Sequence, residues 1–133
     1  VAGDCMRFVS RIETIKTVKG KKIATVIGSQ KNISMNGINP PMEVVAGGGV
    51  RETVENCDIV GFTCIEGDVL QKNYTGQLGI GDYIVIGNCG SYSLVMKPPF
   101  ILQNFPVLDI NEDEVEVIKR AETFDDLFHT FSF

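Results

Sequence analysis

Two short motifs contain the side chains of this chain that are best suited to chemistry. Residues 61–68 read Gly-Phe-Thr-Cys-Ile-Glu-Gly-Asp and place the thiol of Cys64 where an apolar run ends and a polar turn begins. Residues 90–93 read Gly-Ser-Tyr-Ser and contain the phenol of Tyr92. Functional side chains often lie where a strand gives way to a loop. Because a thiol can transfer a proton and a phenol can donate a hydrogen bond, both motifs are candidates for a catalytic or binding site.

Each of these residues also has a structural interpretation. Free cysteine is among the most buried residue types, so Cys64 could be a small hydrophobic residue of the core. Tyr92 could be a core aromatic with a hydrogen-bonded hydroxyl. Asp68 could be an exposed aspartate in a turn. Residue type alone does not separate these interpretations from the functional ones.

Short β-strands are expected to position the two motifs. The β-branched run 8–18 and the run 22–27 flank Gly20 and predict a hairpin. The continuous apolar segment 83–86 is typical of a central strand covered on both faces. Turn residues separate further expected strands at 42–46, 50–54, 57–64 and 83–88. This spacing predicts an all-β fold, a Greek-key-like barrel or sandwich with a short C-terminal helix.

The C-terminal part of the chain is expected to form a hairpin and then that helix. The runs 107–110 and 115–118 flank an acidic turn and predict two paired strands. Thr123, followed three residues later by Asp126, forms a variant of the capping box. We therefore expect a helix over 124–131.

Composition argues against several classes of function. With 133 residues, of which 44% are hydrophobic, the chain is expected to form one domain, residues 1–133. A net charge of -5 gives no support to nucleic-acid binding or to an anionic membrane surface, and no apolar run reaches the roughly 18 residues of a membrane-spanning helix. The glycines 47–49 are followed by no lysine of a phosphate-binding loop, so a tight or mobile strand connection is favoured there.

The cysteines favour a reducing compartment and no metal site. They form no C-x-x-C pair, and His129 is the only histidine, so the ligand set of a zinc site is not expected. No signal peptide is recognisable, and most of the cysteines lie within or beside apolar runs. We expect a cytoplasmic protein. Because the chain begins with Val1, it is expected to be a fragment of a longer protein.

The motifs together resemble the C-terminal β domain of the ornithine/diaminopimelate/arginine decarboxylases. This family depends on pyridoxal phosphate and has the alanine-racemase-like fold type III. The resemblance lies in three segments with matching order, spacing and flanking apolar residues, namely 61–70, 79–86 and 90–93. Weaker matches extend it over nearly the whole chain.

The resemblance implies a function in amino-acid decarboxylation. In the family, a (β/α)₈ barrel binds pyridoxal phosphate through a Schiff-base lysine, and the active site forms at a homodimer interface. Cys64 matches the cysteine that protonates the carbon from which CO₂ leaves, and Tyr92 matches the tyrosine that contacts the cofactor phosphate. Asp68 matches an aspartate near the subunit interface and is assigned a pairing or positioning role. The chain contains neither the barrel nor that lysine, so it is expected to be inactive alone.

Two positions depart from the pattern that the resemblance implies. In ornithine- and diaminopimelate-type enzymes the residue after the cysteine is acidic and holds the distal amino group of the substrate, but here it is Ile65. A second acidic position is here Ile27. A buried ammonium without a counter-charge is costly. The substrate is therefore expected to have an apolar or differently charged tail, unless Glu66 replaces the missing carboxylate.

Two other functions remain open at this point. The chain could be a racemase-like member of the same fold type, although the context of Cys64 argues against a tyrosine base. It could also be a stand-alone β-barrel that binds or assembles with a partner, because a fold does not dictate a function.

Overall fold

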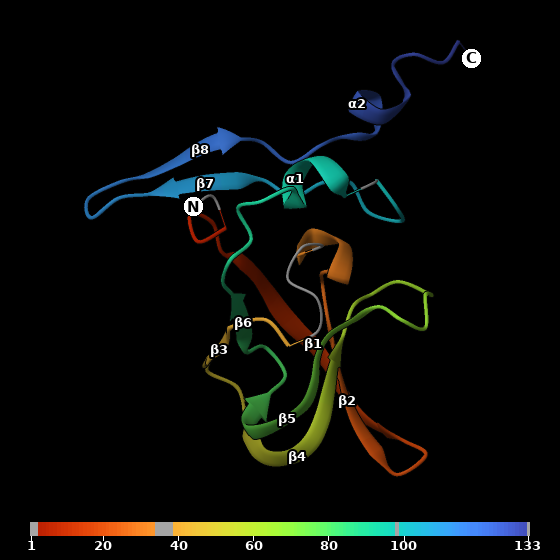
Figure 1. Cartoon of the computed structure of the whole chain (residues 1–133), viewed down its shortest axis with the longest axis vertical. Coiled ribbons are helices and arrows are strands. Elements are labelled where there is room, and N and C mark those ends of the chain that lie inside the picture. The colour runs from red at the N-terminus through yellow and green to blue at the C-terminus, as the bar shows by residue number, and fades with distance from the viewer. Residues whose placement is uncertain (1–2, 34–38, 98, 133) are drawn as a thin grey trace. The chain divides into compact units, whose positions relative to one another are not determined.

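The computed structural model describes residues 3–33, 39–97 and 99–132, and the chain divides into two compact units, Val1–Met96 and Lys97–Phe133. Figure 1 shows the course of the chain. The first unit contains β1 (Phe8–Val18), β2 (Lys21–Val26), η1 (Gln30–Ile33), β3 (Met42–Val45), β4 (Arg51–Val60), β5 (Val69–Gly79), β6 (Tyr83–Ile86) and α1 (Ser93–Met96). The second unit contains β7 (Val107–Ile110), β8 (Val115–Lys119) and α2 (Phe124–Phe128).

A six-stranded sheet with the order β3-β6-β1-β2-β4-β5 forms the first unit. Neighbouring strands are antiparallel, except that β2 and β4 are parallel. Figure 1 shows that β4 and β5 are strongly bent, and their ladder contains three register shifts, which bend and twist strands. The sheet is nearly closed into a barrel, and the expected all-β class is confirmed.

The hydrophobic core of the described residues lies within the first unit. Alternation along the strands turns one set of side chains inward, and the fully buried ones are mostly aliphatic. The core comprises Ile12, Ala24, Val26, Ile33, Val54, Cys57, Ile59, Leu70, Leu78, Ile84, Ile86 and Cys89. This core supports the strand ends from which the candidate site projects.

A buried carboxylate links the two edge strands of this sheet. Asp82 has no exposed surface and accepts hydrogen bonds from the amide of Gly47, just beyond β3, at 3.0 Å and from the amide of Gly79, the last residue of β5, at 2.9 Å. Arg51 Nε donates to the same carboxylate at 2.8 Å. Burial by itself would raise the pKa of Asp82, but the hydrogen bonds from Gly47, Arg51 and Gly79 outweigh burial and hold the pKa below its ordinary value.

The three glycines 47–49 form a tight connection. A Cβ on Gly47 would overlap the carbonyl group of Gly81, so the close approach of these two backbone segments requires glycine. The amide of Gly47 is also used by Asp82. The interpretation as a strand connection, rather than as a phosphate loop, is therefore supported by its contacts.

Several boundaries differ from the prediction. Two strands were expected at 50–54 and 57–64, but β4 runs through Arg51–Val60 and the chain leaves it before Cys64. A bulge at Asn56, which has a φ of 51°, bends the strand without ending it. The long strand β5 was not predicted, because polar residues interrupt its apolar alternation.

The prediction that the strand over 83–86 is buried on both faces was also wrong. Ile84 and Ile86 have no exposed surface, whereas Tyr83 is 42% exposed, because only one face of β6 packs on the core. The hairpins around Gly20 and of β7 with β8 are confirmed.

The capping box at the last helix is confirmed, but the helix is shorter than expected. The backbone amides of Thr123 and Asp126 each donate to the other residue's side chain. Helix α2 then spans only Phe124–Phe128, instead of continuing over 124–131. The short helical elements η1 and α1 were not predicted. In the described ranges, no helix has the length and apolar character needed to cross a membrane.

Candidate functional site

The loop between β4 and β5, residues 61–68, is the Cys64 loop. Its ends are closed by a hydrogen bond of 2.8 Å from the amide of Gly61 to the carbonyl of Asp68, and a turn brings the amide of Asp68 to 2.9 Å from the carbonyl of Ile65. The amide of Phe62 donates to the carbonyl of Gly28 at 3.0 Å, which fixes the loop against the segment after β2. The backbone of the loop is therefore held at both ends.

The carboxylate of Asp68 organises this loop from inside. Asp68 is only 6% exposed and accepts hydrogen bonds from Ser29 Oγ at 3.0 Å and from the amide of Gln30 at 2.6 Å. It also accepts from the hydroxyl of Thr63 at 2.6 Å and from the amide of Thr63 at 3.3 Å. A Cβ on Gly61 would overlap this carboxylate, so glycine is needed for the close approach. Asp68 is thus no exposed turn residue; it positions the segment that carries Cys64.

Cys64 lies on the outer side of the loop. It is exposed and forms no disulfide. The neighbouring side chains of Ile65 and Glu66 are exposed as well, that of Ile65 to 48%. The structural interpretation of Cys64 as a buried thiol is therefore wrong, whereas Cys57 and Cys89 do occupy the core. An accessible thiol on a fixed loop can exchange a proton with a molecule that binds against it.

Tyr92 is also exposed, and its backbone is unusual. Its φ of 63° lies in the left-handed region, which bulky residues rarely adopt, and the side chain is 60% exposed. The carbonyl of Tyr92 accepts a hydrogen bond from the amide of Met96 at 2.9 Å and so begins α1. The interpretation as a core aromatic is wrong. Strained residues of this kind concentrate at functional sites.

The short helix η1 connects the two motifs. Its first residue, Gln30, donates to Asp68, and η1 also contacts α1, which follows Tyr92. Figure 1 shows η1 close to both α1 and the Cys64 loop. The structure thus places Cys64 and Tyr92 on segments that share one neighbour. Ile27, the other position at which an acidic residue was expected, is exposed just before Gly28.

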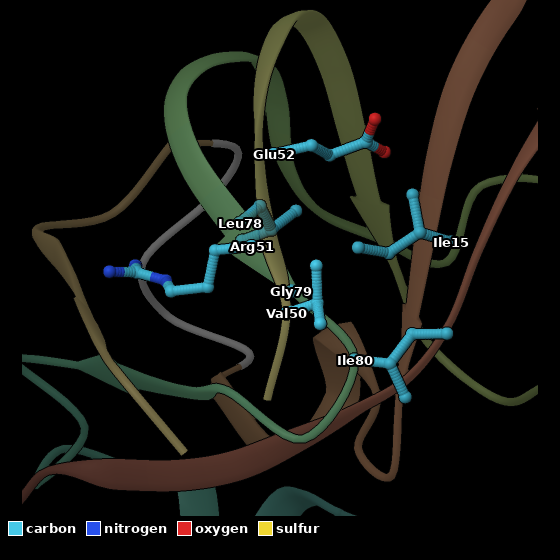
Figure 2. Close-up of a pocket in the computed structure, with 7 residues that line it drawn as sticks. All are labelled: Ile15, Val50, Arg51, Glu52, Leu78, Gly79 and Ile80. Atoms are coloured by element: carbon cyan, nitrogen blue, oxygen red, sulfur yellow. The ribbon is translucent and has the colours of Figure 1, made fainter. Parts of the chain in front are cut away.

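Neither of two hollows on the surface of the first unit is lined by the Cys64 loop. The first hollow has a volume of about 390 Å³ and a partly apolar lining. Figure 2 shows its lining side chains, of which Arg51 points away from the others. This hollow is lined by Ile15, Val50, Arg51, Glu52, Leu78, Gly79 and Ile80. A second hollow of about 460 Å³ contains neither Cys64 nor Tyr92. Within the described residues no group of three or more His, Cys, Asp or Glu side chains could hold a metal ion.

Replacing Asp68 with alanine is expected to destabilise the chain and loosen the Cys64 loop. The variant leaves donors on Ser29, Gln30 and Thr63 without their acceptor, and hydrogen bonds to a charged group contribute roughly 1.5 to 3 kcal/mol each. We expect the free energy of unfolding to fall by about 2 to 3 kcal/mol in urea titrations. Glu66→Ala removes a carboxylate from the exposed side of the same loop and serves as the control. Equal stability of the two variants would show that Asp68 does not organise the loop.

Comparison with known proteins decides the family. The model of the pyridoxal-dependent decarboxylase C-terminal sheet domain matches residues 1–90. The chain belongs to the pyridoxal-dependent decarboxylases. The matched range of this decarboxylase sheet domain includes Cys64, Asp68 and the whole Cys64 loop, and it ends two residues before Tyr92.

Individual relatives agree with this assignment. A diaminopimelate decarboxylase of Methanothermobacter thermautotrophicus is 27% identical over 135 residues, which is 96% of this chain and 30% of the relative. A carboxynorspermidine/carboxyspermidine decarboxylase of Herminiimonas arsenicoxydans is 36% identical over 76 residues, covering 56% of this chain and 21% of the relative. The crystal structure of Helicobacter pylori diaminopimelate decarboxylase complexed with L-lysine has the same fold, with a TM-score of 0.81, 22% identity, and coverage of 97% of this chain and 32% of that one. The sheet domain thus spans about a third or less of the relatives it matches.

Sequence reasoning missed the partners of Asp68 in the decarboxylase sheet domain. Ser29 and Gln30 lie almost forty positions earlier, and no local pattern connects them to the Cys64 loop. The turn after β2 did carry a signal, because Asn32 Oδ1 accepts a hydrogen bond from the amide of Ser29 at 2.9 Å. Side chains of this type commonly cap short turns.

Proposed function

We propose that this chain is the C-terminal domain of a pyridoxal-phosphate-dependent amino-acid decarboxylase and contributes Cys64 and Tyr92 to its active site. One observation carries the proposal: an exposed thiol lies on a loop that the buried Asp68 fixes, within the residues that match the family's sheet domain. Cys64 protonates the carbon from which CO₂ leaves, and Tyr92 donates its phenolic hydrogen bond to the cofactor phosphate.

The residues present fit one half of such a site. Pyridoxal phosphate, when bound, withdraws electrons from the α-carbon of the amino acid as the carboxylate departs. The Cys64 thiol then gives its proton to that carbon and regains one from solvent, so that the product leaves with a hydrogen in place of CO₂. The fixed backbone of the Cys64 loop limits where the thiol can lie, which is how positioning contributes to the rate. The exposed phenol of Tyr92 is a suitable donor to a phosphate oxygen.

The other half of the proposed site is assigned to segments of the polypeptide outside residues 1–133. We propose a barrel domain that carries the cofactor and its Schiff-base lysine, and a homodimer in which Cys64 acts across the interface. The exposure of both Cys64 and Tyr92 at the surface of this chain supports a site that is completed by another surface. We propose a cytoplasmic location, in which the exposed thiol of Cys64 stays reduced.

The proposed substrate is an α-amino acid whose side chain carries no distal ammonium group. Ile65 follows the catalytic cysteine and is half exposed, and Ile27 is exposed on the segment that binds the Cys64 loop through Gly28. Neither offers a charge to an ammonium group. Glu66 is an exposed carboxylate in the same loop. The alternative is that Glu66 binds the ammonium group of a basic substrate, and the experiment below distinguishes the two.

Release of CO₂ by the full-length protein tests both the function and the substrate. With pyridoxal phosphate present, we expect turnover of amino acids with apolar or uncharged tails, and weak turnover of lysine, ornithine and diaminopimelate. Ile65→Glu is expected to improve kcat/KM for a basic substrate about 10-fold or more, because it restores a counter-charge to the distal ammonium group. Efficient turnover of lysine or ornithine that Glu66→Ala leaves unchanged would contradict the substrate assignment. Release from no amino acid would contradict the function.

A further inference from the structure

The second unit exposes an apolar face on its two-stranded sheet. Cα pairing places Leu108 opposite Val117 and Ile110 opposite Val115, with one pair of residues between them. Because side chains alternate along strands, these four lie on one face. They are 47% to 71% exposed. The pair between them occupies the other face.

The opposite face of the hairpin is acidic. Asp109 lies directly opposite Glu116, and both are exposed. Like charges in this arrangement repel each other and need water around them. The turn that joins the strands adds Glu112, Asp113 and Glu114. The face with Leu108, Ile110, Val115 and Val117 is therefore better suited to burial against another surface than the face with Asp109 and Glu116.

The second unit has no core of its own in the part that the structure describes. Of its described side chains only that of Lys97 is buried, and no apolar side chain is. A two-stranded hairpin is marginally stable at best in water and needs packing against a further layer. Contiguous exposed apolar faces commonly mark an interaction surface. The pairing of β7 and β8 thus calls for a covering surface.

The comparisons support one candidate for the covering surface. The family model ends at residue 90, before the second unit begins. The Helicobacter pylori structure nevertheless matches 97% of this chain, which includes most of the second unit, while this chain covers only 32% of it. The hairpin fold is therefore retained in a polypeptide about three times as long, where much more chain is present to pack on it.

We propose that the face formed by Leu108, Ile110, Val115 and Val117 is covered by the segment of the full-length polypeptide that lies outside these 133 residues. The acidic face, with Asp109 and Glu116, remains in solvent. The inference rests on the proposed function in one respect, since it requires the longer polypeptide. It assigns the second unit the role of an attachment between the sheet domain and that segment.

Hydrogen exchange of the β7 and β8 amides tests this attachment. In the full-length protein these amides should exchange at least about tenfold more slowly than in the 133-residue chain, because covered hairpins open less often. Val117→Asp should remove most of this protection, whereas Glu116→Gln on the opposite face should preserve it. Equal exchange in the wild-type full-length protein and the 133-residue chain would overturn the inference, even if the charged variant failed to fold.

Further outcomes distinguish the possible occupants of the apolar face. They also separate this inference from the proposed function. Protection in the 133-residue chain that rises with protein concentration would identify a second copy as the occupant and would also overturn the inference. A full-length protein that releases CO₂ but leaves the hairpin unprotected contradicts this inference alone. A protected hairpin in a protein that decarboxylates no amino acid contradicts the proposed function alone.

Discussion

Cys64→Ala in the full-length protein is expected to lower kcat for decarboxylation about 10²- to 10⁴-fold, the usual contribution of a positioned proton donor. The thiol is exposed on a loop that is fixed by its own backbone hydrogen bonds and by Asp68, so it is presented without the cost of ordering a flexible segment. Alanine removes the proton donor and leaves that scaffold unchanged. The effect should appear in kcat with little change in the free energy of unfolding.

Two further cysteine variants sharpen this measurement. Cys64→Ser keeps the size of the side chain but replaces the thiol with a much weaker acid, so its rate should lie between those of the wild type and alanine. Cys5→Ala changes an exposed cysteine outside the loop and should preserve the rate. If Cys64→Ala retains full kcat, proton donation must come from another group and the assignment of Cys64 is wrong.

Asp82→Ala is expected to lower the free energy of unfolding by about 3 to 5 kcal/mol, the usual result of leaving a partly buried charge without its partner. Asp82 is fully buried and joins Arg51 to the amides of Gly47 and Gly79. Without this carboxylate the guanidinium loses its counter-charge, and two backbone donors at the sheet edges lose their acceptor. Urea titration with a constant m-value would measure the loss.

Glu52→Ala supplies the control for this prediction. Glu52 lies next to Arg51 on β4 and forms an exposed ion pair with Lys22 at 2.5 Å. Pairs of this kind contribute about 0 to 1 kcal/mol, so the control should lose little stability. Comparable losses in the two variants would mean that the buried carboxylate does not hold the sheet edges together.

The same carboxylate predicts how acid affects the fold. Because the pKa of Asp82 is lower when folded than when unfolded, its contribution is fully present above the unfolded value of about 4. It is lost as the pH falls through the lower folded value. The wild type should therefore lose stability below about pH 4, and Asp82→Ala should lose less over the same interval.

Local patterns predicted much of the fold because they depend on neighbouring residues. The hairpin around Gly20 and the capping box of Thr123 are set within a few positions, and both are present. Strand β5 was missed because Gln71, Lys72 and Asn73 interrupt the apolar alternation on which a strand prediction depends. Its position is set by pairing with β4 rather than by its own residue pattern.

The candidate site could be predicted only in part for the same reason. The motif around Cys64 identified the thiol, but its environment depends on Ser29 and Gln30, which reach Asp68 through tertiary structure. Burial of Asp68 and exposure of Tyr92 follow from how η1 and α1 pack, and neither helix has a clear signal in the sequence. The chemistry of the site was visible in residue types, whereas the scaffold that positions it required the fold.

Release of CO₂ by the 133-residue chain and by the full-length protein, measured side by side with pyridoxal phosphate and a panel of α-amino acids, tests the central claim most directly. The claim is that this chain supplies the proton-donating half of a decarboxylase site and that the other half lies elsewhere in the polypeptide. We predict release by the full-length protein and none by the 133-residue chain. Release by the chain alone at a comparable rate, or no release by the full-length protein from any amino acid, would contradict it.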